Sequence, residues 1–207
     1  MTIALLIIDS QKGFDHPTYW GPARSNPKYE ENITALLATF RALPENPLII
    51  HVQHHSRLEE WLLHPSKPTC EFMHYTYPDT SRGELVITKR ENSAFIGTDL
   101  EKILRERNVK RIYMAGLTTD HCVSTTTRMA ANLGITRVAV KTESGEEELR
   151  EPEGLDGIVF VQDATACWQK PDGKWDAETV HSVHVESLKE FARIADTREV
   201  VGELGTN

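Results

Sequence analysis

The sequence has few cysteines and no long apolar run. Its three cysteines, Cys70, Cys122 and Cys167, are odd in number and widely spaced among 207 residues. That spacing argues against a disulfide framework and against a structural zinc site. No apolar run approaches the ~20 residues that a membrane-spanning helix needs, and the first residues form no signal-peptide pattern. We therefore expect a cytoplasmic protein with no membrane partner.

Positive charge is also scarce. The chain has 23 Lys and Arg residues against 31 Asp and Glu residues, for a formal net charge of -8. This balance provides no basic surface for nucleic acid or anionic membranes, so we expect a small-molecule substrate and no nucleic-acid partner. The length suits one α/β domain that spans residues 1–207.

Seven of the carboxylates are concentrated between Glu143 and Asp156, together with a single arginine. This stretch separates two strand-like runs, Arg137 to Val140 and Ile158 to Gln162. We interpret residues 141–157 as an exposed acidic insertion that forms a hairpin or a short helix. Its simplest role is a solvated surface loop, and the functional alternatives are a lid or an oligomer contact.

Elsewhere, apolar runs alternate with helix-like segments. The expected strands are Ile3–Ile8, Pro47–Gln53, Leu85–Thr88 and Arg111–Ala115, besides the runs beside the insertion. The expected helices are Asn32–Leu43, Asp99–Arg107, Ser124–Leu133 and Ala177–Ile194. This order predicts a three-layer α/β/α sandwich with a mostly parallel sheet of about six strands and right-handed crossovers.

Three expected strands end in reactive side chains. Asp9 follows the first strand, Lys89 follows Leu85–Thr88, and Cys122 lies in the octet Gly116–Val123 after Arg111–Ala115. Because the carboxyl ends of parallel strands form the ligand-binding rim of an open α/β sheet, these groups can converge there. Taken singly, Asp9 could cap a helix, Lys89 could be solvated and Cys122 could be a small packed hydrophobe.

Cys122 lies just before the expected helix Ser124–Leu133. Free backbone N–H groups and the helix dipole at such a position favour a thiolate. The same N–H groups can receive the oxyanion of an attacked carbonyl, so the turn predicts a nucleophile together with its electrostatic partner.

Three blocks, Leu5–Phe14, Lys89–Phe95 and Gly116–Val123, resemble those of the isochorismatase-like cysteine hydrolases, in the same order. That superfamily includes nicotinamidases, N-carbamoylsarcosine amidohydrolases and isochorismatases. Gln162–Ala166 and Ala177–Leu188 resemble its last strand and its C-terminal helix. The resemblance covers about residue 3 to residue 195 and implies an isochorismatase-like, Rossmann-like fold. It also implies a homo-oligomer, either a dimer or a tetramer.

The resemblance further implies a triad of Asp9, Lys89 and Cys122. Cys122 would attack the substrate carbonyl, Asp9 would move the proton and activate water, and Lys89 would lower the pKa of the thiol. The oxyanion would lie against the backbone N–H groups of Cys122 and Thr118. A cis peptide bond between Leu117 and Thr118 belongs to this geometry.

Residues near the three strand ends are the candidates for substrate binding. The aromatic candidates are Phe14, Trp20, Trp61, Tyr75 and Trp168. Phe14 and Trp168 are favoured because each lies a few residues beyond a rim strand, although any of the rings could instead belong to the core. Thr119 and His121 flank the nucleophile, and His121 could also be exposed and idle.

Nicotinamidases of this superfamily hold a metal ion with an Asp and two His residues. The corresponding stretch here, His51–Ser56, has no carboxylate in the required place. His51 and His54 would also point to opposite faces of a strand. We therefore expect no metal and no cofactor, which disfavours nicotinamidase activity.

Three functions remain open. The leading hypothesis is hydrolysis of a non-peptide C–N bond in a small amide, ureido or imide compound, through a thioester at Cys122. The second is isochorismatase-type hydrolysis of a vinyl ether with Asp9 as the acid, for which the cysteine is dispensable. The third is a catalytically silent binding protein of the same fold.

Overall fold

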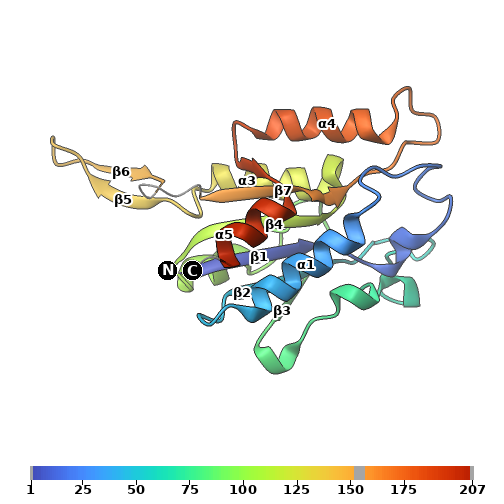
Figure 1. Cartoon of the computed structure of the whole chain (residues 1–207), viewed down its shortest axis with the longest axis horizontal. Coiled ribbons are helices and arrows are strands. Elements are labelled where there is room, and N and C mark those ends of the chain that lie inside the picture. The colour runs from blue at the N-terminus through green and yellow to red at the C-terminus, as the bar shows by residue number, and fades with distance from the viewer. Residues whose placement is uncertain (1, 152–156, 206–207) are drawn as a thin grey trace.

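A computed structural model describes residues 2–151 and 157–205. Its centre is a six-stranded sheet with the strand order β3-β2-β1-β4-β7-β8 (Figure 1). All neighbouring strands of this sheet pair in parallel. The strands are β1 (Thr2–Ile8), β2 (Leu48–His54), β3 (Leu85–Lys89), β4 (Val109–Leu117), β7 (Ile158–Ala166) and β8 (Arg193–Ala195).

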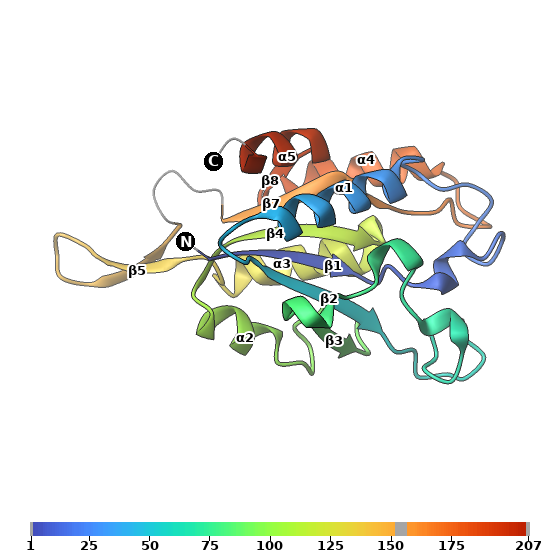
Figure 2. The same cartoon turned by 60° about the horizontal axis from the view of Figure 1, so that its bottom comes forward.

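Helices cover both faces of the sheet, which confirms the predicted α/β/α architecture. They are α1 (Tyr29–Ala42), α2 (Leu100–Glu106), α3 (Ser124–Asn132), α4 (Ala177–Leu188) and α5 (Thr197–Gly205). Figure 2 shows α1 and α5 on the same side of the sheet, where Leu5 and Ile7 of β1 pack with them. Leu6 and Ile8 pack with residues of α2, α3 and α4 on the other face, as the two-residue period of a strand requires. No helix in the described part of the chain is both long and apolar enough to cross a membrane.

The C-terminal region differs from the expectation of one helix from Ala177 to Ile194. Helix α4 ends at Leu188, and Arg193–Ala195 forms β8, the outermost strand beside β7. Helix α5 then returns to pack on α1 and β7. A strand of only three residues carries too short a pattern to separate it from a helical one in the sequence.

The acidic insertion contains a β-hairpin. Strand β5 (Val138–Lys141) pairs antiparallel with β6 (Glu147–Arg150), outside the central sheet. The hairpin projects from the end of the molecule that holds the amino end of β1, away from the carboxyl ends of the parallel strands (Figure 1). It therefore cannot serve as a lid over those ends. Residues 152–156 of the predicted insertion lie outside the described residues.

The order of the strands reverses between β1 and β4. The chain runs from β1 to β2 and β3 on one side, and later continues from β4 to β7 and β8 on the other. In open parallel sheets such a switch point opens a crevice at the carboxyl ends of the strands. Asp9 lies there with a left-handed φ of 52°, directly after β1, so the chain turns away from the sheet at this residue.

Candidate active site

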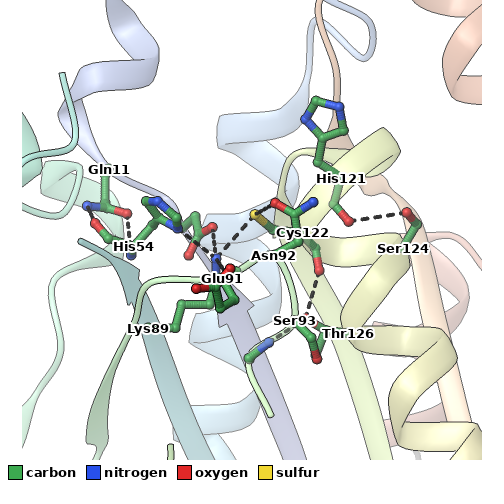
Figure 3. Close-up of polar contacts among 12 residues, drawn as sticks. Gln11, His54, Lys89, Glu91, Asn92, Ser93, His121, Cys122, Ser124 and Thr126 are labelled. Atoms are coloured by element: carbon green, nitrogen blue, oxygen red, sulfur yellow. Dashed lines mark hydrogen bonds and ion pairs between the residues drawn. The ribbon is translucent and has the colours of Figure 1, made fainter. Parts of the chain in front are cut away.

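The three strand ends bring Asp9, Lys89 and Cys122 into one cluster. Lys89 Nζ lies 3.2 Å from Cys122 Sγ (Figure 3). It also lies 2.7 Å from Asp9 Oδ2. Cys122 belongs to a π-helical turn, Thr119–Val123, which connects β4 to α3. Asp9 and Cys122, which are far apart in the sequence, therefore both contact Lys89 at the crevice.

The ion pair between Asp9 and Lys89 is buried. Their side chains are 1% and 0% exposed. Burial lowers the pKa of Lys89, but the Asp9 carboxylate and the Cys122 sulfur outweigh it, so this pKa lies above its ordinary value. Lys89 therefore stays an ammonium in the resting site.

The pKa of the Cys122 thiol is also raised, but for a thiol this favours the neutral form. Burial and the Asp9 carboxylate raise its pKa above the ordinary value, and Lys89 opposes them only in part. The expected lowering of this pKa is therefore wrong for the resting site, because the assembled fold removes water from the thiol and places the Asp9 charge beside it. A nucleophile held as a thiol needs a proton acceptor, and none of the described residues donates a hydrogen bond to the buried Asp9 Oδ1.

His54, the last residue of β2, joins this cluster. The sequence pattern suggests it only as a candidate metal ligand. Its Nδ1 lies 3.1 Å from Lys89 Nζ. Since an ammonium can only donate, Nδ1 accepts the hydrogen bond, and the imidazole is neutral. Burial and Lys89 lower the pKa of His54, which keeps it neutral. Its place at a strand end was the signal that could have identified it.

A cavity of about 880 Å³ opens above the cluster. Phe14 forms its wall with Trp20 and Trp168, at ring-centroid distances of 4.5 and 5.5 Å. Tyr19 and Trp61 also line the cavity, although each side chain is more than two-fifths exposed. A concave pocket lined by aromatic side chains is typical of a ligand-binding site.

Most of the predicted substrate-binding residues line this cavity. They are Phe14, Trp20, His121 and Trp168, and the predicted oxyanion-hole residue Thr118 lies there as well. The prediction for Thr119 is wrong for its side chain. That side chain is fully buried, and its Oγ1 bonds Thr165 Oγ1 at 3.0 Å and His181 Nδ1 at 2.9 Å. Tyr75, the other aromatic candidate, packs against the core.

The cationic side chains around the cavity differ in their partners. Arg57 pairs with Glu91 at 2.5 Å, and Lys170 pairs with Asp120 at 3.1 Å. Arg90 has no carboxylate partner within residues 2–151 and 157–205, and its charge lowers the pKa of His55. Among the described residues, Arg90 is thus a cationic side chain at the cavity without a carboxylate partner.

The backbone around the predicted oxyanion hole has a special geometry. The Leu117–Thr118 peptide bond is cis. Thr118 Oγ1 is buried and bonds none of the described residues. The use of the Thr118 and Cys122 backbone N–H groups as an oxyanion hole stays a prediction.

The arrangement does not fit a metal ion. Within the part of the chain that the structure describes, Asp9, His54 and Cys122 offer ligand atoms within 4.8 Å of one another. The Lys89 ammonium contacts all three residues and occupies the position that a cation would take. His51 bonds Glu84 Oε2 at 2.9 Å instead.

Comparisons with known proteins agree with this geometry. A family model described as the isochorismatase domain matches residues 3–142. The isochorismatase family protein YrdC of Bacillus subtilis is 35% identical over 204 residues, which cover 97% of this chain and 95% of YrdC. A crystal structure described as an isochorismatase-family hydrolase from Chromobacterium violaceum has a TM-score of 0.81 at 30% identity, covering 100% of this chain and 95% of its own. A cysteine hydrolase from Pseudomonas syringae shares the fold, with a TM-score of 0.77 at 22% identity, over 99% of this chain and 92% of its own.

Proposed function

Because the chain belongs to the isochorismatase family of hydrolases, we propose that it hydrolyses a non-peptide C–N bond with Cys122 as the nucleophile. The substrate is a small amide, ureido or imide compound. One observation carries this proposal: the Lys89 ammonium contacts both Asp9 and Cys122 at a buried point below an open cavity.

In the first half-reaction, Cys122 Sγ bonds to the substrate carbonyl carbon while its proton passes to Asp9. Oδ1 suits this step because Lys89 holds the other carboxylate oxygen, Oδ2. The oxyanion lies against the backbone N–H groups of Thr118 and Cys122. Asp9 then gives the proton to the leaving nitrogen, the C–N bond breaks, and a thioester remains.

In the second half-reaction, Asp9 takes a proton from water, and the resulting hydroxide attacks the thioester carbon. The C–S bond breaks, the acid product leaves, and Cys122 regains its proton from Asp9. The Lys89 ammonium stays charged throughout. It balances the negative charge whether that charge lies on Asp9 or on the oxyanion, so no step leaves an uncompensated charge in the buried cluster. None of the steps requires a metal ion.

The cavity supports a substrate with two features beyond the scissile bond. The wall of Phe14, Trp20 and Trp168 favours a flat, apolar group. Arg90, which has no carboxylate partner in the part of the chain that the structure describes, favours an anionic group such as a carboxylate.

Hydrolysis of a vinyl ether is the second candidate. The raised pKa of the Cys122 thiol favours it, because this chemistry leaves the cysteine protonated. This route requires Asp9 to be protonated first. Asp9 would then donate its proton to the vinyl carbon, water would add to the resulting oxocarbenium carbon and return a proton to Asp9, and the hemiketal would release the alcohol and leave a carbonyl product. A Cys122→Ala variant would stay active. This mechanism makes no use of the contact between Lys89 and Cys122, so we favour the amide route.

Intact-mass spectrometry tests the two routes. The wild type, Cys122→Ala and Asp9→Asn are incubated briefly with a panel of amides, ureido acids, carbonyl electrophiles and vinyl ethers. The amide route requires an acyl adduct on Cys122 and loss of turnover in both variants. Turnover of a vinyl ether that survives in Cys122→Ala would replace it with the ether route. Absence of any adduct, with Cys122 no more reactive than the other two cysteines, would leave the ether hydrolase or the silent binding protein.

We also propose that the protein is a homo-oligomer, which rests on the family resemblance alone. Light scattering tests the assembly directly. A single mass equal to that of one 23.4 kDa chain would contradict it.

A further inference from the structure

We propose that His54 is a positioning residue that holds the Lys89 ammonium between Asp9 and Cys122. This inference deepens the proposed function and rests on it, because it concerns the same nucleophile. In this proposal His54 acts as a hydrogen-bond acceptor for Lys89 and does not contact the substrate.

The first argument is the number of acceptors around Lys89 Nζ. Asp9 Oδ2 lies at 2.7 Å, His54 Nδ1 and the Glu91 carbonyl oxygen each at 3.1 Å, and Cys122 Sγ at 3.2 Å. An ammonium carries three hydrogens, so four acceptors compete for them. The two neutral acceptors, from His54 and Glu91, limit how far the ammonium can turn toward the Asp9 carboxylate, its strongest partner.

The second argument is that His54 is itself held in place. The His54 backbone N–H donates to Gln11 Oε1 at 2.8 Å, and the His54 carbonyl accepts from Gln11 Nε2 at 3.0 Å (Figure 3). Gln11 is fully buried and also donates to the Cys70 carbonyl at 2.7 Å. Because the buried Gln11 side chain bonds both backbone groups of His54, the His54 Nδ1 atom has a defined position relative to Lys89.

The third argument is the protonation state. A protonated imidazole would present an N–H group and a second positive charge to the ammonium. Burial, Lys89 and His55 lower the pKa of His54, whereas Asp9 and Glu91 raise it, and the net direction is down. His54 is therefore the neutral acceptor above this pKa, and it loses that role as the pH falls below it.

Removing the acceptor should let the ammonium move toward Asp9 and away from Sγ. The Cys122 thiolate then loses part of its stabilisation, and the thiol reacts more slowly. The rate of Cys122 alkylation by iodoacetamide measures this effect without any substrate. The alkylation experiment therefore tests the role of His54 separately from the proposed amide hydrolysis, and it gives a result whether or not the protein hydrolyses an amide.

The experiment follows alkylation of Cys122 by peptide mapping between about pH 5 and pH 10 in four proteins. They are the wild type, His54→Leu, His54→Asn and His55→Leu. Asparagine places an acceptor oxygen where Nδ1 was but does not titrate. His55 is the matched control because burial lowers its pKa as well, and its ring bonds Gln53 Oε1 rather than Lys89.

We expect His54→Leu to slow alkylation about tenfold at neutral pH, the change that one unit of thiol pKa produces. The wild-type rate should show a second titration at acidic pH, where His54 takes up a proton. His54→Asn should stay close to the wild-type rate but lack this titration. His55→Leu should match the wild-type rate at neutral pH and keep the acid titration, moved slightly upward because His55 no longer lowers the pKa of His54.

Equal rates and equal pH profiles in His54→Leu and the wild type would overturn the proposal. An equal loss in His54→Leu and His55→Leu would also overturn it, because the effect would then be one of packing. If leucine prevents folding, His54→Asn decides alone: an acid titration that persists in this variant would show that His54 does not control the cluster.

Discussion

Gly116 of β4 lies directly against the backbone of Ile8 in β1. A Cβ atom added to Gly116 would fall 2.0 Å from the Ile8 carbonyl oxygen, and the glycine has a φ of 119°. Ile8 immediately precedes Asp9, so this contact sets how closely the nucleophile turn approaches the carboxylate.

Gly116→Ala should therefore destabilise the protein and displace Asp9. Gly97→Ala is the matched control, because Gly97 also has a positive φ, of 69°, but its added Cβ meets nothing within 4 Å. We expect about 1 kcal/mol of lost unfolding free energy for Gly97→Ala and at least about 2 kcal/mol more for Gly116→Ala. Urea unfolding measures both, and equal losses would show that β1 and β4 separate without cost.

The buried ion pair predicts strong coupling between Asp9 and Lys89. Either Lys89→Met or Asp9→Asn alone leaves one charge buried without its partner, which costs about 3–5 kcal/mol. The double variant leaves neither charge, so it should lose far less than the sum of the two. A double-mutant cycle on the free energy of unfolding measures the coupling, and additive losses would mean that water replaces the missing partner.

The raised thiol pKa predicts the direction of the pH dependence. Burial and the Asp9 charge disfavour the Cys122 thiolate, so its fraction should still increase above the ordinary cysteine pKa of about 8.5. Alkylation of Cys122 should accordingly keep accelerating to pH 10. Cys167, which is buried and whose pKa is raised to about 12, should remain unmodified until the protein unfolds. A rate that levels off near neutral pH would show a thiolate at rest.

Arg90 should discriminate in favour of anionic substrates. In the Cys122→Ala background, a carbamoylbenzoate should bind about tenfold more tightly than the methylbenzamide of similar shape, a difference of about 1.4 kcal/mol. Arg90→Gln should abolish that preference. Arg57→Gln should retain it, because Arg57 already pairs with Glu91. Calorimetry with the ortho, meta and para isomers measures the preference, and equal affinities in all variants would remove the anionic group from the proposed substrate.

Much of the site was predictable from the sequence because the fold places strand ends together. A buried parallel strand is a local apolar run, and the residue that follows it is visible in the sequence. Asp9, Lys89 and Cys122 were identified in this way, and so were Phe14 and Trp168. Their convergence follows from the geometry of a parallel sheet, whatever the detailed packing.

The remaining features depended on contacts between distant segments. His54 and Thr119 both lie near strand ends, yet one contacts Lys89 and the other bonds Thr165 and His181 inside the core. The thiol pKa of Cys122 rises because the assembled fold removes water from it and places Asp9 beside it. The chemical groups that reach the rim can be identified from the sequence, since strand periodicity is a local property. Their partners, protonation states and orientation depend on the assembled fold, because every segment that packs around them contributes to desolvation and hydrogen bonding.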